Sequence, residues 1–117
     1  MPTLGEYLTS VRCPMEKVTH YLMSDLPNVD GKGKRAFFEA FGFSRNKPLD
    51  LVRALESHGR SHPIVDHYED EWGERWEVLG RFPCPDGRLP VVRTAWIRRS
   101  GDAMPMLVTV MPDKLQI

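Results

Sequence analysis

The fold is decided by a change of hydrophobic period at residues 76–82, which read WEVLGRF. Every second residue from Trp76 to Phe82 is Trp, Val, Gly or Phe, and the residues between them are Glu, Leu and Arg. This period of two is typical of a half-buried β-strand. The turn signal PDG follows at 85–87, and residues 89–99, LPVVRTAWIRR, are rich in β-branched and aromatic side chains. A link this short between two strands requires antiparallel pairing.

Two further strands extend this pair. Residues 100–102, SGD, indicate another turn, and residues 106–111 are typical of a last strand that Pro112 stops. A weaker first strand is expected near residues 64–68. We therefore predict a four-stranded antiparallel β meander over residues 62–112.

Before residue 60 the apolar residues recur at helical spacing. The capping box TLGE at residues 3–6 predicts a short helix that runs to about Val11. Three more helices are predicted: one from Pro14 to about Leu26, one that Asn28 or Asp30 caps and Gly42 closes, and one from about Pro48 to Gly59.

The predicted fold class is α+β, with N-terminal helices packed on one face of a four-stranded antiparallel β meander. The other face of the sheet would then be free for a ligand. We predict a single domain over residues 1–117, with an N-terminal extension at 1–12, helical residues at 14–59 and the meander at 62–112. A chain of 117 residues has room for one core.

Composition indicates a cytoplasmic protein with no membrane partner. The apolar runs are too short to cross a bilayer, and the first eleven residues lack the pattern of a secretory signal. Cys13 and Cys84 are far apart and each precedes a proline, so free thiols in a reducing compartment are expected.

The formal net charge is zero, which argues weakly against a generic nucleic-acid binder, but the charges are unevenly distributed. Residues 31–60 contain seven basic and three acidic side chains, residues 61–80 one basic and six acidic, and residues 81–102 five basic and two acidic. If the two basic regions meet in space, they would form a surface that attracts phosphate. The alternative is a solvated surface of mixed charge.

Residues 31–35, GKGKR, are the first candidate site, although they lack the spacing of a P-loop. Lys32, Lys34 and Arg35 would lie in the first turn of a helix, where the helix dipole disfavours positive charge. A bound anion would offset that cost, because free backbone N–H groups at this position already bind anions. The sequence therefore predicts a phosphate site here. The alternatives are solvated lysines or a helix that begins later.

His58 is the second candidate, because it lies at the predicted end of a helix and titrates near neutral pH. It could act as a general acid or base, or merely stabilise the helix end. His58 and His62 have the spacing of two ligands on one helix face, with His67 nearby, but Pro63 and the helix end argue against a shared face. We therefore expect no metal and no cofactor.

The last two strands carry the third candidate site. Arg93 interrupts an otherwise apolar row within residues 91–97, so its charge needs a partner or an open groove. There it could hold a phosphate with two hydrogen bonds. Thr94 lies on the opposite side of this strand, together with Trp96, and Thr109 lies on the next strand. Trp96 could stack on a base or could be a core residue against the helices.

The order of these motifs resembles a bacterial domain family of undefined biochemistry. That family recurs as small standalone reading frames and as C-terminal modules of polymorphic toxins. The resemblance covers about residues 16–112 and rests on these motifs: Lys17-Val18-x-x-Tyr21-Leu22, residues 31–38, Gly42-Phe43-Ser44, Leu55-x-x-His58, Trp72-Gly73-x-Arg75-Trp76-x-Val78, residues 85–88, Val92-Arg93-Thr94-x-Trp96 and Leu107-Val108-Thr109-x-x-Pro112.

The layout of that family is similar to the barnase–EndoU–colicin–RelE (BECR) group of metal-independent ribonuclease toxins, which is a likeness of fold. This similarity implies general acid/base cleavage of RNA, with His58 as base or acid. Lys34 and Arg93 would stabilise the phosphate, and Thr109 would donate a hydrogen bond. Lys32, Arg35, Thr94 and Trp96 would bind the substrate.

One departure from the family pattern concerns that acid/base chemistry. Members often carry a histidine shortly before the glycine-lysine motif, where this chain has Asn28. If that histidine is catalytic in relatives, this chain is impaired or uses His58 differently.

The function expected from the sequence is an endoribonuclease toxin of a bacterial toxin–antitoxin or polymorphic toxin system. Its partners would be RNA and a cognate antitoxin or immunity protein, and polymorphic toxins can be delivered into the cytoplasm of other cells. The alternative is a non-catalytic, immunity-like interaction domain that uses the open sheet face or the acidic residues 66–77. Zero net charge and the lack of a decisive acid/base pair favour that alternative. A third interpretation is a structural domain that merely shares the fold.

Overall fold

The computed structural model describes residues 3–7, 10–23 and 32–113. In it the predicted meander is confirmed as one antiparallel sheet with the strand order β1-β2-β3-β4. Trp76 pairs with Trp96 at its centre, and Arg93 pairs with Met111 near the end of the last strand. The strands are β1 (Ile64–Asp70), β2 (Gly73–Arg81), β3 (Val91–Arg98) and β4 (Met106–Pro112).

The helices precede the strands, so the predicted α+β class is confirmed. They are α1 (Leu4–Tyr7), α2 (Met15–Lys17) with the π-helical turn η1 (Val18–Leu22) directly after it, α3 (Lys32–Ala40) and α4 (Pro48–Ser61).

Three helix ends differ from the prediction. The first helix ends at Tyr7 rather than near Val11, and the chain pairs with β4 through Arg12 and Met106. The second, expected to run to about Leu26, ends in η1 at Leu22. The last helix continues two residues past Gly59. The predicted caps Asn28 and Asp30 lie outside the described residues.

Gly42 closes α3 as predicted. Its φ is 100°, a conformation that glycine adopts without strain. Its N–H donates to the carbonyl oxygen of Glu39, and the N–H of Phe43 donates to that of Phe38. These two bonds form a Schellman motif, which satisfies carbonyl groups that the helix end would leave free.

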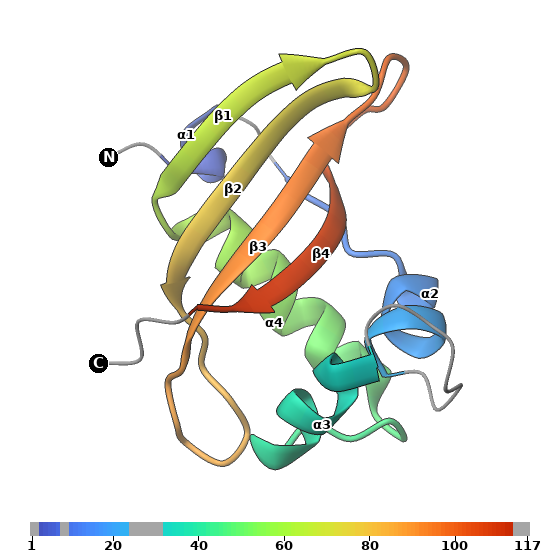
Figure 1. The fold of residues 1–117 in the computed structure, drawn as a ribbon, viewed down its shortest axis with the longest axis vertical. Helices are drawn as coiled ribbons and strands as arrows, with labels where there is room; N and C mark the ends of the chain where they lie inside the picture. The colour runs from blue at the N-terminus through green and yellow to red at the C-terminus, as the bar shows by residue number, and fades with distance from the viewer. Residues whose placement is uncertain (1–2, 8–9, 24–31, 114–117) are drawn as a thin grey trace.

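Helix α4 covers one face of the sheet, and Figure 1 shows it crossing behind the strands with no described helix in front of them. The row of β3 that faces α4 is Val92, Thr94 and Trp96, all 0% exposed. In the opposite row Val91, Arg93 and Ala95 are only half-buried, while Ile97 is buried. We call the uncovered side the open face. Helix η1 lies beyond the edge strand β4 (Figure 1), and α3 packs against η1.

Close packing of α4 on the sheet requires a glycine at residue 59. A Cβ atom built on Gly59 would lie 2.3 Å from Cζ2 of Trp96, which is far inside van der Waals contact. Trp96 is therefore a core residue, the alternative interpretation of its sequence position. None of the described helices is both long enough and apolar enough to cross a membrane.

Candidate functional site

His58 lies in the protein core between α4 and the sheet, with only 1% of its surface exposed. Its Nε2 is 3.1 Å from the carbonyl oxygen of Gly80, and its Nδ1 is 3.0 Å from Oγ1 of Thr94. A carbonyl oxygen only accepts, so Nε2 carries the proton and Nδ1 accepts from the Thr94 hydroxyl. Thr94 Oγ1 in turn accepts from Nε1 of Trp96 at 2.9 Å. Every polar atom in this chain of hydrogen bonds has a partner.

Burial lowers the pKa of His58 to about 4, and its partner at Gly80 opposes this shift only in part. His58 is therefore neutral at pH 7 and has no access to solvent. From the sequence, His58 was expected to act as general acid or base, and Thr94 and Trp96 were expected to bind the substrate. The structure places all three in the core, where they hold α4 against β2 and β3.

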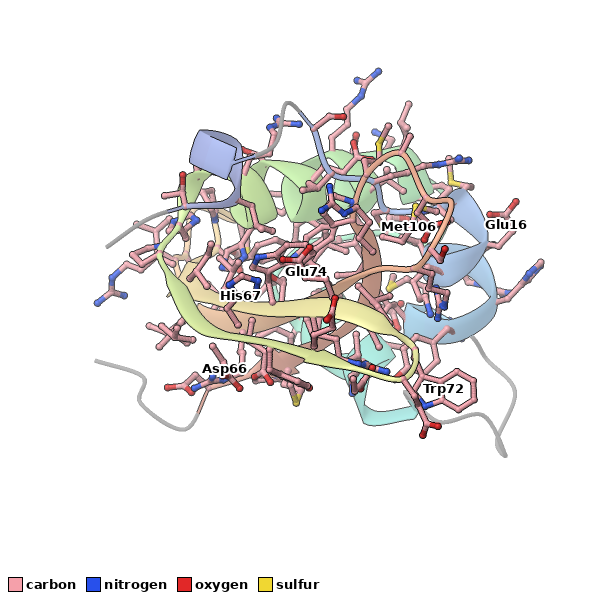
Figure 2. The ribbon with its side chains drawn as sticks, turned by 90° about the horizontal axis from the view of Figure 1, so that it is seen from above. Glu16, Asp66, His67, Trp72, Glu74 and Met106 are labelled. Atoms are coloured by element: carbon pink, nitrogen blue, oxygen red, sulfur yellow. The ribbon has the colours of Figure 1, made fainter. Side chains whose placement is uncertain are left out.

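Of the three histidines considered as metal ligands, His58 and His62 lie together and His67 lies elsewhere. His62 stacks on His58 with the ring centroids 4.6 Å apart. His67 stacks on Trp76, and its Nε2 lies 2.7 Å from Oε2 of Glu74. Figure 2 shows His67 and Glu74 together on the hairpin of β1 and β2.

A different group of side chains meets at the edge of the sheet. The hydroxyl of Tyr21, from η1, lies 3.1 Å from Oγ1 of Thr109 on β4. The ammonium groups of Lys17 and Lys34 lie 5.2 and 5.9 Å from the centroid of the Tyr21 ring. We call Lys17, Tyr21, Lys34 and Thr109 the Tyr21 cluster. Two of its members, Lys34 and Thr109, are candidate catalytic residues from the sequence.

Local structure explains how these side chains come together. Lys17 and Tyr21 are four residues apart and so share one face of their helix. The π-helical turn ends in a bond from the N–H of Met23 to the carbonyl oxygen of Val18, and such turns are frequent at functional sites. Thr109 pairs with Ala95 directly beside a register shift between β3 and β4.

The electrostatics of the Tyr21 cluster favour an anion. Among the described residues, neither Lys17 nor Lys34 forms an ion pair with a carboxylate. Both ammonium groups lie near the aromatic ring, an attraction that holds them close to the hydroxyls of Tyr21 and Thr109. Two cations beside two hydroxyl donors can bind a phosphate group.

Arg93 lies on the open face, in the same row as Thr109. It pairs with Met111, and Thr109 pairs with Ala95, which makes Arg93 and Thr109 diagonal neighbours across the two strands. The guanidinium of Arg93 is 3.2 Å from Oε1 of Glu77, and its side chain is about one-third exposed. Arg93 and His58 therefore lie on opposite sides of β3, so Lys34, His58 and Arg93 do not line one groove.

The two remaining basic candidates lie in the first turn of α3. Arg35 forms an ion pair with Glu39 at 2.9 Å, one helical turn away. The side chain of Lys32 lies outside what the structure describes.

Sequence reasoning missed Lys17 and Tyr21 as site residues. Their spacing of four, with one cation and one aromatic ring, was the available signal, and both stand in the first motif of the family resemblance. Their contact with Lys34 and Thr109 depends on how η1 lies against β4, which local spacing does not encode.

A groove of about 390 Å³ opens between α3, the loop after β2 and the end of β4. Phe37 on α3 and Phe41, directly after that helix, form one wall, and the guanidinium of Arg88 lies 4.1 Å from the centroid of the Phe41 ring. The lining is completed by these residues: Arg81, Leu89, Pro90, Pro112 and Asp113.

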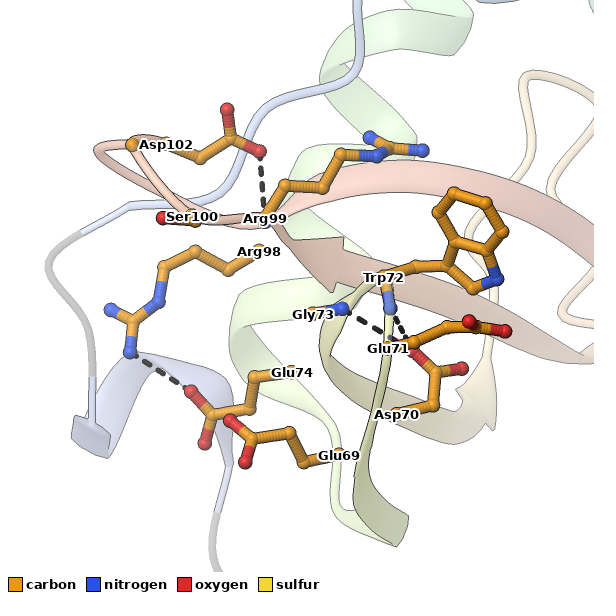
Figure 3. A pocket seen from close by; sticks show the side chains of 11 residues that line it. Glu69, Asp70, Glu71, Trp72, Gly73, Glu74, Arg98, Arg99, Ser100 and Asp102 are labelled. Atoms are coloured by element: carbon orange, nitrogen blue, oxygen red, sulfur yellow. Dashed lines mark hydrogen bonds and ion pairs between the residues drawn. The ribbon is translucent and has the colours of Figure 1, made fainter.

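A second hollow, of about 380 Å³, lies at the opposite end of the sheet between the two hairpin tips (Figure 3). Two of its carboxylates, Asp70 and Glu74, form ion pairs. Asp70 accepts from the backbone N–H groups of Trp72 and Gly73 and binds Arg75, while Glu74 binds Arg98 at 2.9 Å. The side chain of Trp72 is 63% exposed at this tip (Figure 2).

Comparison with known proteins relates the chain to a sequence family and to solved structures. The sequence model of a family described as "Domain of unknown function (DUF6883)" matches residues 3–114. No curated protein matches the sequence. Among solved structures, a chain from the "Contact-dependent growth inhibition toxin - immunity protein complex from Klebsiella pneumoniae 342" is similar in fold, with a TM-score of 0.70 and 18% identity. The match covers 86% of this chain and 98% of that chain.

Proposed function

The chain belongs to the DUF6883 family, and from that premise we propose that it is a toxin that cleaves RNA and is restrained by a cognate partner protein. The similar solved chain supports this proposal, because it comes from a complex of a growth-inhibition toxin with its immunity protein. The resemblance of the sequence motifs to modules of polymorphic toxins supports it independently. The site of action would be the cytoplasm of the cell that receives the toxin.

The Tyr21 cluster is the observation that carries the proposal. A phosphodiester bound there would accept charge-assisted hydrogen bonds from Lys17 and Lys34, and Arg93 would approach it along the same face of the sheet. Negative charge on the phosphate increases as the 2′-oxygen attacks, so these cations stabilise the transition state more than the ground state. The residues of the chain supply this positive charge themselves, and the cleavage we propose is metal-independent.

Tyr21 is the group placed to move a proton. In the proposed reaction the 2′-oxygen attacks phosphorus while its proton passes to water. The bond from phosphorus to the 5′-oxygen breaks, and the Tyr21 hydroxyl gives its proton to that oxygen. Thr109, 3.1 Å away, orients the hydroxyl, and water restores the phenol proton afterwards. The products are a 2′,3′-cyclic phosphate and a 5′-hydroxyl.

Growth of cells that express the chain without its partner tests this function. We expect induction to arrest growth, and Lys34→Ala to relieve the arrest while the protein accumulates to the same level. Lys47→Ala is the matched control, because Lys47 is an exposed lysine at the start of α4. Harmless induction of the intact chain, or equal arrest by the Lys34 variant, would contradict the proposal.

The acidic hairpin supports a second candidate, an immunity-like subunit without catalysis. Residues 66–77 contain six carboxylates and one arginine, and Trp72 at its tip is 63% exposed. Exposed tryptophans are common anchors of protein interfaces. This candidate predicts that the chain protects cells from a toxin and leaves RNA intact, so the same growth assay separates the two functions.

A further inference from the structure

We propose that the groove between α3 and β4 holds a nucleobase of the RNA whose phosphate binds the Tyr21 cluster. This inference rests on the proposed function and adds a substrate-binding subsite to it. The occupant is an unpaired base close to the bound phosphate, which makes single-stranded RNA the substrate class.

The groove and the Tyr21 cluster are joined along two elements. Lys34 and Phe37 are three residues apart on α3 and so lie along one face of the helix, and Phe41 follows directly after its last residue. Lys34 contacts the Tyr21 ring at one end, and Phe37 and Phe41 line the groove at the other. Lys34 and Ala40, the last residue of α3, are six positions apart, a helical rise of about 9 Å.

Strand β4 also leads from the Tyr21 cluster to the groove, opposite α3. Thr109 touches Tyr21, while Pro112 and Asp113 line the groove three and four residues further on. Asp113 also lies 4.0 Å from Arg93, so the guanidinium adjoins the groove. A strand of RNA with its phosphate at Tyr21 therefore has a continuous path to the groove.

The chemistry of the groove suits a flat aromatic base. The rings of Phe37 and Phe41 have centroids 4.8 Å apart, and Arg88 lies over Phe41. Arg88 is held in place by Asp86 at 2.6 Å and by the carbonyl oxygen of Ala40. Fixed aromatic rings and an ordered guanidinium form a stacking platform without reorganisation on binding.

Charge favours RNA over an apolar protein segment as the occupant. The path leads from Lys17 and Lys34 to Arg93, which also contacts Glu77 and Asp113, and a nucleic acid supplies one phosphate for each nucleotide. The rim of the groove adds Arg81 and Arg88. A protein side chain would fill the apolar floor but would leave the adjoining lysines without an anion.

Binding of short single-stranded RNAs, methylated at the 2′-oxygen so that they cannot be cleaved, tests the proposal. One base at a time is replaced by an abasic site, and affinity for the full chain is measured by fluorescence anisotropy. We expect one position near the bound phosphate to weaken binding between about fivefold and a hundredfold. In Phe41→Ala and Leu89→Ser, binding of the intact RNA should weaken similarly, and the abasic site should then have no further effect.

Leu89 is 48% exposed, so Leu89→Ser reports on the groove even if Phe41→Ala unfolds the protein. Leu49→Ser is the matched control, because Leu49 is an exposed leucine outside the groove, and its binding should be unchanged.

Three results would overturn the inference. In the first, RNA binds and Lys34→Ala weakens that binding, but the abasic sites lower the affinity of the intact chain and of the groove variants equally. The groove is then not a base subsite, and the proposed function stands. If the groove variants bind RNA normally but no longer bind a purified partner protein, the groove is a protein-docking site. If the intact chain binds no RNA at all, the proposed function fails and the inference fails with it.

Discussion

The hydroxyl of Tyr21 lies 3.1 Å from Oγ1 of Thr109, although 88 positions separate the two residues in the chain. This contact joins the helical half of the protein to the last strand of the sheet. It also places the only two hydroxyl groups of the Tyr21 cluster next to each other, with Lys17 and Lys34 beside the ring. The account of RNA cleavage depends on this arrangement.

Thr109→Val removes the hydroxyl that orients Tyr21 and keeps the β-branched shape of the side chain. We expect kcat for RNA cleavage to fall about tenfold or more with KM little changed, because the change acts on proton transfer rather than on binding. Thr109→Ser restores the hydroxyl and should recover most of the rate. Equal activity of the valine and serine variants would contradict the role assigned to this residue.

The salt dependence of RNA binding should report on Lys34. Each phosphate contact on single-stranded nucleic acid contributes about 0.7 to the slope of log affinity against log salt concentration. Lys34→Ala is therefore expected to reduce the slope by about that amount, and Lys17→Ala to do the same. Lys47→Ala serves as the control with an unchanged slope. A Lys34 variant with the slope of the intact chain would show that this ammonium contacts no phosphate.

His58 should make the fold sensitive to acid. Its pKa is about 4 in the folded chain and about 6.5 in the unfolded chain, so the unfolded state binds the proton first as pH falls. The free energy of unfolding is therefore highest above pH 6.5 and falls as pH drops towards 4, by about 2 kcal/mol at pH 5. Urea unfolding of the intact chain at pH 7.5 and pH 5 measures this loss.

His58→Gln is the matched comparison for that experiment, since glutamine does not titrate. The variant should be less stable at pH 7.5, because the hydrogen bonds to Gly80 and Thr94 are disturbed. Its further loss between pH 7.5 and 5 should be smaller than that of the intact chain by about 2 kcal/mol. Identical pH dependence in the two proteins would mean that His58 is not the neutral buried group described above.

Much of the fold was predictable from local patterns. The change from helical spacing to a period of two separates the helices from the strands, and the turn residues at 85–87 and 100–102 fix the antiparallel order. Gly42 was predicted to close α3 because a Schellman motif needs a left-handed residue. The end of the first helix was not predictable, because Arg12 pairs with a strand that lies far away in sequence.

The site was less predictable than the fold. Leu51, Leu55 and His58 recur at spacings of four and three, a signal that places His58 on the buried face of α4, yet its titration near neutral pH suggested chemistry instead. Lys34 and Thr109 were identified by residue type and motif. Their meeting at Tyr21 depends on the packing of η1 against the edge of the sheet, which no local pattern encodes.

The Tyr21 hydroxyl offers the most direct test of the central claim, that the Tyr21 cluster cleaves RNA. Purified intact chain and Tyr21→Phe are incubated with RNA in the presence of EDTA, and the new ends are analysed chemically. Tyr68→Phe is the control, because Tyr68 is an exposed tyrosine on β1. We predict 2′,3′-cyclic phosphate ends from the intact chain and the control, and cleavage at least a hundredfold slower by Tyr21→Phe at unchanged stability. Intact RNA after incubation with the intact chain, or equal cleavage by Tyr21→Phe, would contradict the account.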